Sequence, residues 1–336
     1  MSTLIVLEHH FFKDKNGDIW CDRVVSYDFL KRYLEVFSEI TVCARMSEID
    51  YIPTDKLLVS GENVNFIPLP EFVGIKGIVQ NYFKISRIME AALKQASCVI
   101  LRGPSHLSLL CYRKISKRKI PFAVEFMMAA NKMLEGNSII HRCINSYIDK
   151  LSKKMCLAAN GVAYVTDTIL QHNYPCRALT FGTNKEFFST NYSSIDLFEE
   201  NYYKQNWKKD DIPQIFEIIH TGYMDSLRKG QDTLIKAVKI VLDNGYNVNL
   251  KFIGEGKKMD YFKQLVYSLN MEMNVEFLGL ITEKKEISDK LKSAHLFVLP
   301  TQSEGLPRSI LEAMAVGLPC ISSPVDGVPE IVREDM

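Results

Sequence analysis

Short runs of apolar, often β-branched residues alternate with helical segments along the whole chain, and this alternation limits the possible folds more than any other feature. In the first half, residues 26–37 and 81–95 have the apolar spacing of amphipathic helices. The apolar runs there lie at residues 3–7, 40–44, 64–68, 98–101, 122–126 and 161–166. Apolar strands separated by helices are typical of a parallel sheet that is covered on both faces.

The pattern starts again after a polar stretch. Residues 189–213 are polar, contain several aromatic side chains and have no clean period, so we interpret them as a linker. The second series has strands at residues 214–220, 247–253, 275–278, 296–300 and 319–322, and helices at 231–244, 258–269, 283–293 and 307–316. The predicted fold class is α/β, with two Rossmann-like doubly wound domains facing a cleft, residues 1–188 and 214–336. Functional residues are then expected in loops that follow strands.

The composition of the chain excludes several classes of partner and site. The 41 Lys+Arg and 40 Asp+Glu leave a net charge of +1, which argues against a nucleic-acid partner. The eight cysteines lack CxxC spacing and the histidines lack metal-site spacing, so we expect reduced thiols and no metal. No apolar stretch approaches the roughly 18 residues of a membrane span. We expect a cytoplasmic protein, with the inner face of the plasma membrane as a further possible location.

The most informative loop follows the strand at 296–300 and contains Glu304, Gly305 and Leu306. Pro307 suits a first helical position, and Gly317 suits the position just after a helix. The start of a helix offers free N–H groups and a positive dipole end to a phosphate. Glu304 and Glu312 flank this start and could accept hydrogen bonds from sugar hydroxyls. The alternative is structural: Glu312 could pair with Arg308 one turn away.

Two further loops follow strands. Arg228 and Lys229 lie where the loop after residues 214–220 meets the next helix, and they could neutralise a diphosphate or form a solvated basic turn. The loop with Glu255 and Gly256 matches half of a dinucleotide-binding fingerprint, with Met259 in place of the third glycine. Neither a P-loop nor a nucleophile elbow is present, which excludes P-loop NTPases and α/β-hydrolases.

Together, the motifs between Gly222 and Pro329 resemble the retaining GT-B glycosyltransferases of family 4, also called group 1 glycosyltransferases. The residues that carry the resemblance are Gly222 with 229–230, then 252–256, 275–279, 297–300 and, from Glu304 to Val332, EGLPRSILEAMAVGLPCISSPVDGVPEIV. Glu304 and Glu312 match the family's pair of glutamates separated by seven residues. The sequence ends soon after this segment, where the family usually continues into another strand and a terminal helix.

The resemblance implies a role for each matching residue. Glu304 would accept hydrogen bonds from the donor sugar, and Glu312 from the nucleotide ribose. The N–H groups around Gly305 and Leu306 would hold the diphosphate, with Lys229 supplying positive charge near Gly222. Glu255 and Gly256 would lie near the base. Tyr223 stands where the family usually has a phosphate-binding arginine, and Arg228 is the candidate substitute.

The first half contributes acceptor-side candidates. The loops after two of its strands contain His9, His10 and His106, and family members often bring a histidine from such loops toward the sugar. For His106 the alternative is a structural role at a helix start. Five cations in seven residues, Arg113, Lys114, Lys117, Arg118 and Lys119, form either a solvated helix end or a contact with anionic lipid.

The function implied by the resemblance is transfer of a sugar, with retention and without a metal, from a nucleotide diphosphate sugar. The acceptor would be a glycan or a polyprenyl-linked glycan, in bacterial surface polysaccharide biosynthesis. Two alternatives stay open. One is a non-catalytic nucleotide-sugar-binding subunit or inactive truncated homologue, motivated by Tyr223 and the early end of the sequence. The other is a GT-B-like nucleotide-sugar epimerase.

Overall fold

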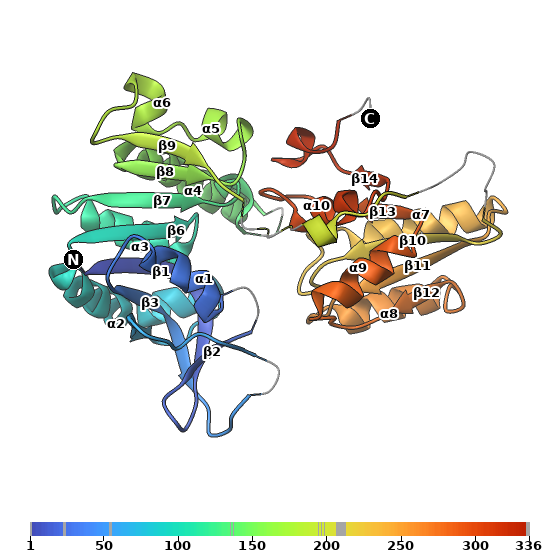
Figure 1. The fold of residues 1–336 in the computed structure, drawn as a ribbon, viewed down its shortest axis with the longest axis horizontal. Coiled ribbons are helices and arrows are strands. Elements are labelled where there is room, and N and C mark those ends of the chain that lie inside the picture. Colours follow the sequence, from blue (N-terminus) through green and yellow to red (C-terminus); the bar gives the residue numbers. More distant parts are fainter. Residues whose placement is uncertain are drawn as a thin grey trace. The chain divides into compact units, whose positions relative to one another are not determined.

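A computed structural model of the protein describes residues 2–333 except 23–24, 54–55, 135, 137, 194, 196, 198 and 206–212. The chain divides into unit 1, Met1–Tyr192, and unit 2, Ser193–Met336 (Figure 1). The first residues of the predicted linker form the end of strand β9 (Phe188–Asn191), which belongs to the sheet of unit 1. Residues 194, 196, 198 and 206–212 of that linker lie outside the described residues.

Unit 1 is built on a parallel sheet with the strand order β5-β3-β1-β6-β7-β8-β9. Its strands are β1 (Thr3–Lys13), β3 (Ile40–Glu48), β5 (Val64–Leu69), β6 (Cys98–Gly103), β7 (Phe122–Phe126) and β8 (Gly161–Tyr164). All six were predicted, but β1 continues six residues beyond the predicted end. Its extension pairs with β2 (Ile19–Cys21), which pairs with β4 (Leu57–Leu58), and this antiparallel arm was not predicted.

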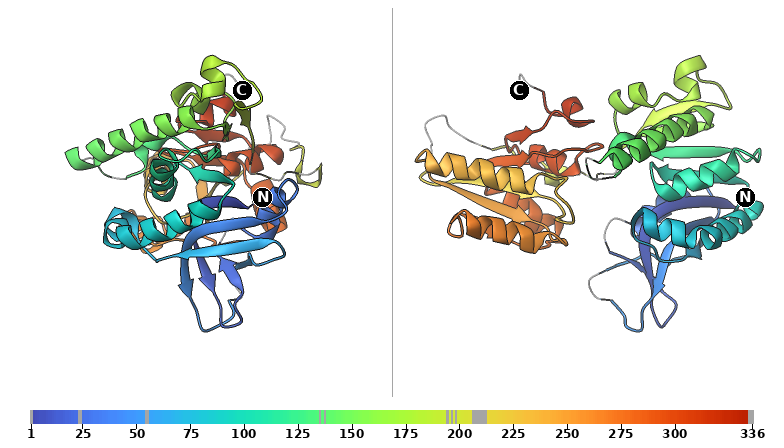
Figure 2. Two further views of the ribbon diagram at one scale, coloured as in Figure 1. Left: turned by 90° about the vertical axis from the view of Figure 1, so that its left-hand side faces the viewer. Right: turned by 180° about the vertical axis from the view of Figure 1, so that it is seen from behind.

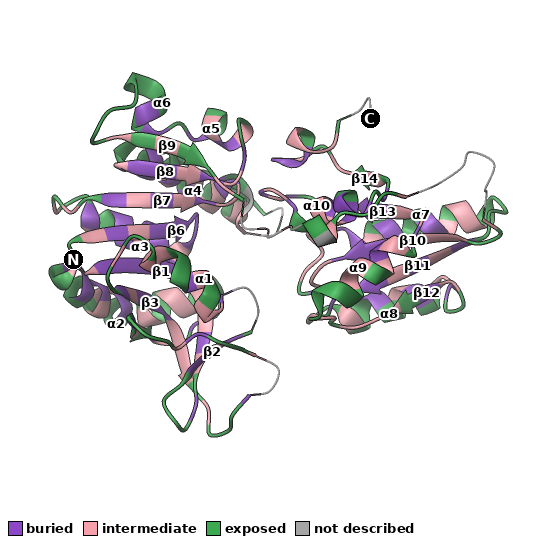
Figure 3. Cartoon of the chain, in the orientation of Figure 1, coloured by how far each residue is buried: buried purple, intermediate pink, exposed green. Residues whose placement is uncertain are grey.

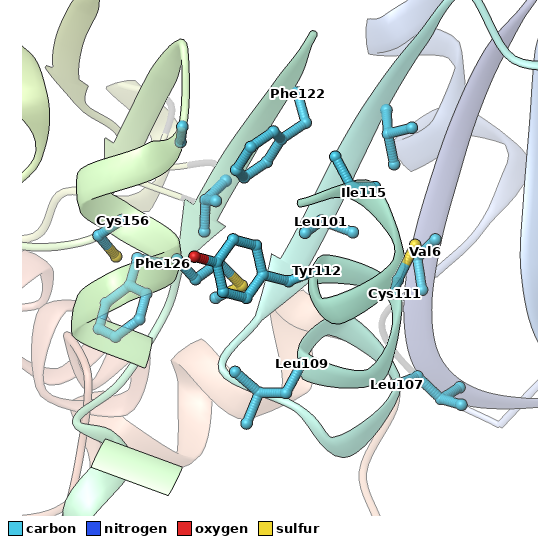
Figure 4. Close-up of a cluster of buried hydrophobic side chains, with 14 of the residues drawn as sticks. Val6, Leu101, Leu107, Leu109, Cys111, Tyr112, Ile115, Phe122, Phe126 and Cys156 are labelled. Atoms are coloured by element: carbon cyan, nitrogen blue, oxygen red, sulfur yellow. The ribbon is translucent and has the colours of Figure 1, made fainter. Parts of the chain in front are cut away.

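Helices cover both faces of this sheet. The helices α2 (Gly74–Gln95), α3 (His106–Ile115) and α4 (Ile139–Ala158) lie on one face, and α1 (Tyr27–Leu34) packs on the other (Figure 2). Successive side chains of β1 pack into different cores. Leu4 and Val6 pack into the core on the side of α2, α3 and α4, and Ile5 packs into the core on the side of α1. Figure 4 shows Val6, Tyr112 and Phe122 within the first core. The short helices α5 (Ile169–Asn173) and α6 (Arg177–Phe181) follow β8.

Unit 2 contains a smaller parallel sheet with the order β12-β11-β10-β13-β14. Its strands are β10 (Phe216–Thr221), β11 (Val248–Ile253), β12 (Val275–Phe277), β13 (Leu296–Leu299) and β14 (Cys320–Ser322). The core on one face includes residues of α7 (Gln231–Asp243) and α8 (Met259–Ser268), and the core on the other includes residues of α9 (Lys284–Lys292) and α10 (Arg308–Ala315). Figure 3 shows buried strand residues beneath helices whose outer sides are exposed.

These elements confirm the α/β prediction, and most boundaries differ from the predicted ones by one or two residues. Two helix starts were wrong. Helix α2 begins at Gly74, seven residues before the predicted position. Pro307 has extended ψ and caps α10 instead of forming its first residue, while Gly317 does follow the helix with φ +71°. None of the helices that the described residues form is long and apolar enough to cross a bilayer.

One close approach within unit 2 positions the loops after β10 and β13. Gly230 precedes α7 with φ +76°, and a Cβ atom there would lie 2.0 Å from the Pro300 carbonyl oxygen. Only glycine combines this left-handed conformation with so close a contact. The start of α7 therefore packs directly against the end of β13.

We expect Gly230→Ala to destabilise unit 2 by more than Gly245→Ala does. Gly245 has φ +85°, but nothing lies within 4 Å of its added Cβ, so its substitution costs only the left-handed conformation, about 1–2 kcal/mol. Gly230→Ala adds the overlap with Pro300. Urea unfolding of both variants measures the difference. Equal losses of stability would show that the backbone yields at Gly230 without cost.

Candidate functional site

The loops after β10 and β13 bring an ammonium and a carboxylate together. The strands are parallel neighbours, so their carboxyl ends lie at the same edge of the sheet. Lys229, at the end of the β10–α7 loop, donates a hydrogen bond from Nζ to Oε1 of Glu304 in the β13–α10 loop. The side chains are 28% and 13% exposed, so this ion pair lies partly shielded from solvent. The sequence analysis selected both residues, and the structure places them in direct contact.

Main-chain contacts fix the Glu304 loop. Thr301 is buried, and its hydroxyl donates to the carbonyl oxygen of Arg228 at 3.1 Å. The N–H of Gln302 donates to the same oxygen at 2.8 Å. Arg228, predicted as a phosphate ligand, thus has a main-chain role in joining the two loops. From the other side, Asp326 accepts hydrogen bonds from this loop through its carboxylate, a contact that was not predicted.

Unpaired N–H groups follow Glu304. Among the described residues, the N–H groups of Gly305 and Leu306 have no hydrogen-bond partner, and α10 begins two residues later without a side-chain cap. Gly305 is buried and Leu306 half-buried. Such N–H groups at the positive end of a helix can bind an anion. The diphosphate was predicted at these N–H groups, and its binding there stays a prediction.

The glycines of the β10 and β11 loops permit close backbone packing. Gly254 has φ +136°, and a Cβ there would lie 2.1 Å from the Gly222 carbonyl oxygen. Gly256 has φ +158°, and its Cβ would lie 2.3 Å from the carbonyl carbon of Met224. The Glu255 side chain is exposed, with Oε1 3.3 Å from the position of a Cβ on Gly279. Gly254 and Gly256 therefore let the loop after β11 lie directly against Gly222 and Met224 of the loop after β10.

Glu312 lies on α10 and is half-buried. Burial raises the pKa of its carboxyl above the usual value, although the positive charges of Arg308 and Lys284 partly oppose this. Among the described residues no salt bridge joins Glu312 to Arg308, although the charge of Arg308 acts on this carboxyl, so the structural alternative stays a prediction. A shielded carboxyl without a fixed partner can accept hydrogen bonds from hydroxyl groups.

His220 is a buried residue of this region that the sequence analysis did not select. Its Nδ1 donates to the Val298 carbonyl oxygen at 2.8 Å, and its ring is parallel to that of Phe297. Burial, assisted by the charge of Lys229, lowers the pKa of His220 to about 4. The neutral ring therefore carries its proton on Nδ1, and the bare Nε2 lies 3.2 Å from the position of a Cβ on Gly222. Because His220 lies inside an apolar strand, nothing in its sequence context indicated that it belongs to this region.

In unit 1, His106 is the first residue of α3 and contacts the carboxylate of Glu8 in the middle of β1. Its Nδ1 donates to Oε1 of Glu8 at 3.0 Å, and the N–H of Leu107 donates to Oε2 at 3.2 Å. Burial alone would raise the pKa of Glu8, but the His106 hydrogen bond and nearby positive charges lower it overall. His9 and His10 are adjacent in β1, and only His10 bonds to Ser47, through Nε2 at 2.7 Å.

The basic run lies at the end of α3 and in the turn after it. Arg113, Lys117 and Lys119 are exposed and Arg118 is half-buried. Lys114 instead donates to the carboxylate of Glu90 on α2 at 3.0 Å. The run therefore has four cations available to a partner.

Comparison with known proteins finds a family match in unit 2. The family model for glycosyl transferases group 1 matches residues 217–336. The protein CapJ of Staphylococcus aureus is 26% identical over 335 residues, which cover 98% of this chain and 81% of CapJ. The amylovoran biosynthesis glycosyltransferase AmsK of Erwinia amylovora is 31% identical over 134 residues, 38% of this chain and 32% of AmsK.

A solved structure supports the fold. The crystal structure of HepE from Anabaena, in complex with UDP and glucose, superimposes with a TM-score of 0.60 at 16% identity, covering 99% of this chain and 83% of HepE. At this identity the likeness concerns the fold alone. These findings show that the chain has the GT-B fold and that unit 2 is similar to the glycosyl transferases group 1.

Proposed function

We propose that the protein transfers a sugar, with retention of anomeric configuration, from a nucleotide diphosphate sugar to a glycan or polyprenyl-linked glycan in bacterial surface polysaccharide biosynthesis. The observation that carries this proposal is the contact between Lys229 and Glu304 beside the unpaired N–H groups of Gly305 and Leu306. The UDP and glucose bound by HepE and the biosynthetic role in AmsK's name are consistent with it.

The electrostatics of this arrangement suit departure of a diphosphate. When the anomeric C–O bond breaks, negative charge grows on the leaving diphosphate and positive character grows on the sugar ring. Lys229 and the N–H groups at the start of α10 would stabilise the first charge without a metal. One positioned donor of this kind is typically worth about 3 kcal/mol, or a factor of about 100 in rate. Glu304 would bind sugar hydroxyls, and Glu312 the nucleotide ribose.

Substitution of Glu304 tests the proposal. We expect a screen of nucleotide sugars that measures nucleotide release and glycoside formation to find one donor that the protein uses. With that donor, Glu304→Gln should lower kcat about 100-fold, because it removes a carboxylate that acts on the reacting sugar. Glu272→Gln, an exposed position in unit 2, is the matched control and should retain full activity.

Substitution of Glu312 should give a different kinetic signature. We expect Glu312→Ala to raise KM for the donor more than Glu304→Gln does, because a ribose contact acts almost equally in the ground and transition states. Identical effects on kcat and KM would contradict the two roles. Nucleotide binding without turnover would favour the non-catalytic alternative. An epimeric nucleotide sugar formed without a new glycoside would favour the epimerase, whereas nucleotide release together with a new glycoside would exclude it.

We further propose that unit 1 contacts anionic lipid, as a polyprenyl-linked acceptor requires. Lys114, within the basic run, donates a hydrogen bond to Glu90 on α2, so the exposed cations of the run lie near this helix. Val73, just before α2, and Val79 and Phe83 on α2 are 73%, 67% and 87% exposed. Between residues 74 and 89 this helix carries three cations and no acidic residue. Exposed apolar side chains among cations suit the interface of an anionic bilayer.

Vesicle binding measures this contact. Neutralising Lys117, Arg118 and Lys119, or replacing Val79 and Phe83 by serine, should each reduce binding to vesicles that contain phosphatidylglycerol. Binding of the wild type should also weaken as salt increases. Val36→Ser is the control, since Val36 is 79% exposed but follows α1 on the other face of the sheet. Binding that none of these changes affects would disprove the proposed surface.

A further inference from the structure

Asp326 connects a third loop to the Glu304 loop. It lies between β14 and the short 3-10 helix η3 (Val328–Glu330). Its Oδ2 accepts one hydrogen bond from the hydroxyl of Ser303 at 2.7 Å and another from the N–H of Glu304 at 3.0 Å. Ser303 itself is buried. The backbone of Glu304 is thus held by a carboxylate while its side chain meets Lys229.

The backbone conformation of Asp326 indicates that its side chain is needed. Asp326 has φ +46°, in the left-handed region that disfavours residues with a Cβ. The next residue is Gly327, which has φ −80° and makes no use of its freedom. A glycine at position 326 would adopt the left-handed conformation without cost. An aspartate there accepts strain in exchange for its two hydrogen bonds, a pattern that occurs at functional sites.

We propose that Asp326 is a positioning residue for sugar transfer, an inference that rests on the proposed function. By accepting the N–H of Glu304, it fixes the direction of the Glu304 carboxylate and leaves the N–H groups of Gly305 and Leu306 for the diphosphate. Without it, the loop loses two of its anchors, and Glu304 no longer has one orientation toward the sugar. A small misplacement of such a group has a large effect on rate.

Asp326 cannot act by attracting the diphosphate, because its own charge is negative. A carboxylate next to an anion-binding loop weakens the binding of a diphosphate. Its contribution must therefore come from geometry, which an uncharged amide can also supply. Asparagine accepts hydrogen bonds through Oδ1 and tolerates the left-handed region, so it keeps both features of Asp326 apart from the charge.

Three substitutions in the full-length protein separate these contributions. Asp326→Gly removes both hydrogen bonds and the strain, so it should lower kcat at least 10-fold while the urea midpoint stays the same or rises. Asp326→Asn should keep kcat within about threefold of wild type and should not weaken donor binding. Asp326→Ala removes the bonds and keeps the strain, so it should lose both activity and stability.

Hydrogen exchange of the Glu304 amide supplies a readout that does not need activity. Exchange there should accelerate at least 10-fold in Asp326→Gly and stay near the wild-type rate in Asp326→Asn. Wild-type kcat in the glycine variant, or unchanged exchange at Glu304, would overturn the proposal. If no nucleotide sugar is a donor for the wild type, the proposed function fails, whereas the exchange comparison still decides whether Asp326 holds the loop.

Discussion

The contact between the start of α7 and the end of β13 is the constraint on which the candidate site depends. It is possible because Gly230 has a left-handed backbone and no Cβ against the Pro300 carbonyl. The carbonyl of Arg228 then accepts hydrogen bonds from Thr301 and Gln302, so the two loops form one surface. Lys229 and Glu304 meet on that surface although they lie 75 residues apart in the sequence. The geometry of the candidate site therefore depends on how the two loops pack against each other, more than on either loop alone.

Much of this arrangement could be predicted, because the signals were local. Apolar runs and helical periods located the parallel strands to within a few residues. Glycine, proline and charged residues at strand ends then located the loops that contain Lys229 and Glu304. The prediction failed where the local pattern was not that of a strand or a helix. The extension of β1 reads EHHFFK, without alternation of polar and apolar residues, and it pairs with an antiparallel arm. The start of α2 contains two glycines, which disfavour a helix, so its first two turns were not predicted.

The rest of the site depends on partners that are distant in sequence. Asp326 followed by glycine is a common turn signal, and nothing local indicates that its carboxylate reaches Glu304. His220 lies within an apolar strand, and only the fold shows that Val298 fixes its tautomer. Arg228 was selected for its charge, yet the structure assigns its carbonyl oxygen a role as well. Side-chain type indicates possible chemistry, whereas tertiary contacts decide which atom performs it.

The carboxylate of Glu8 has a consequence for the kind of chemical group that unit 1 can receive. Glu8 accepts hydrogen bonds from the N–H of Leu107 and from Nδ1 of His106, so the protein's own carboxylate already balances the positive end of α3. A phosphate approaching that turn would meet a like charge instead of an open helix end. The start of α3 therefore discriminates against anionic groups, whereas the start of α10 has N–H groups that can receive one, although both helices follow parallel strands.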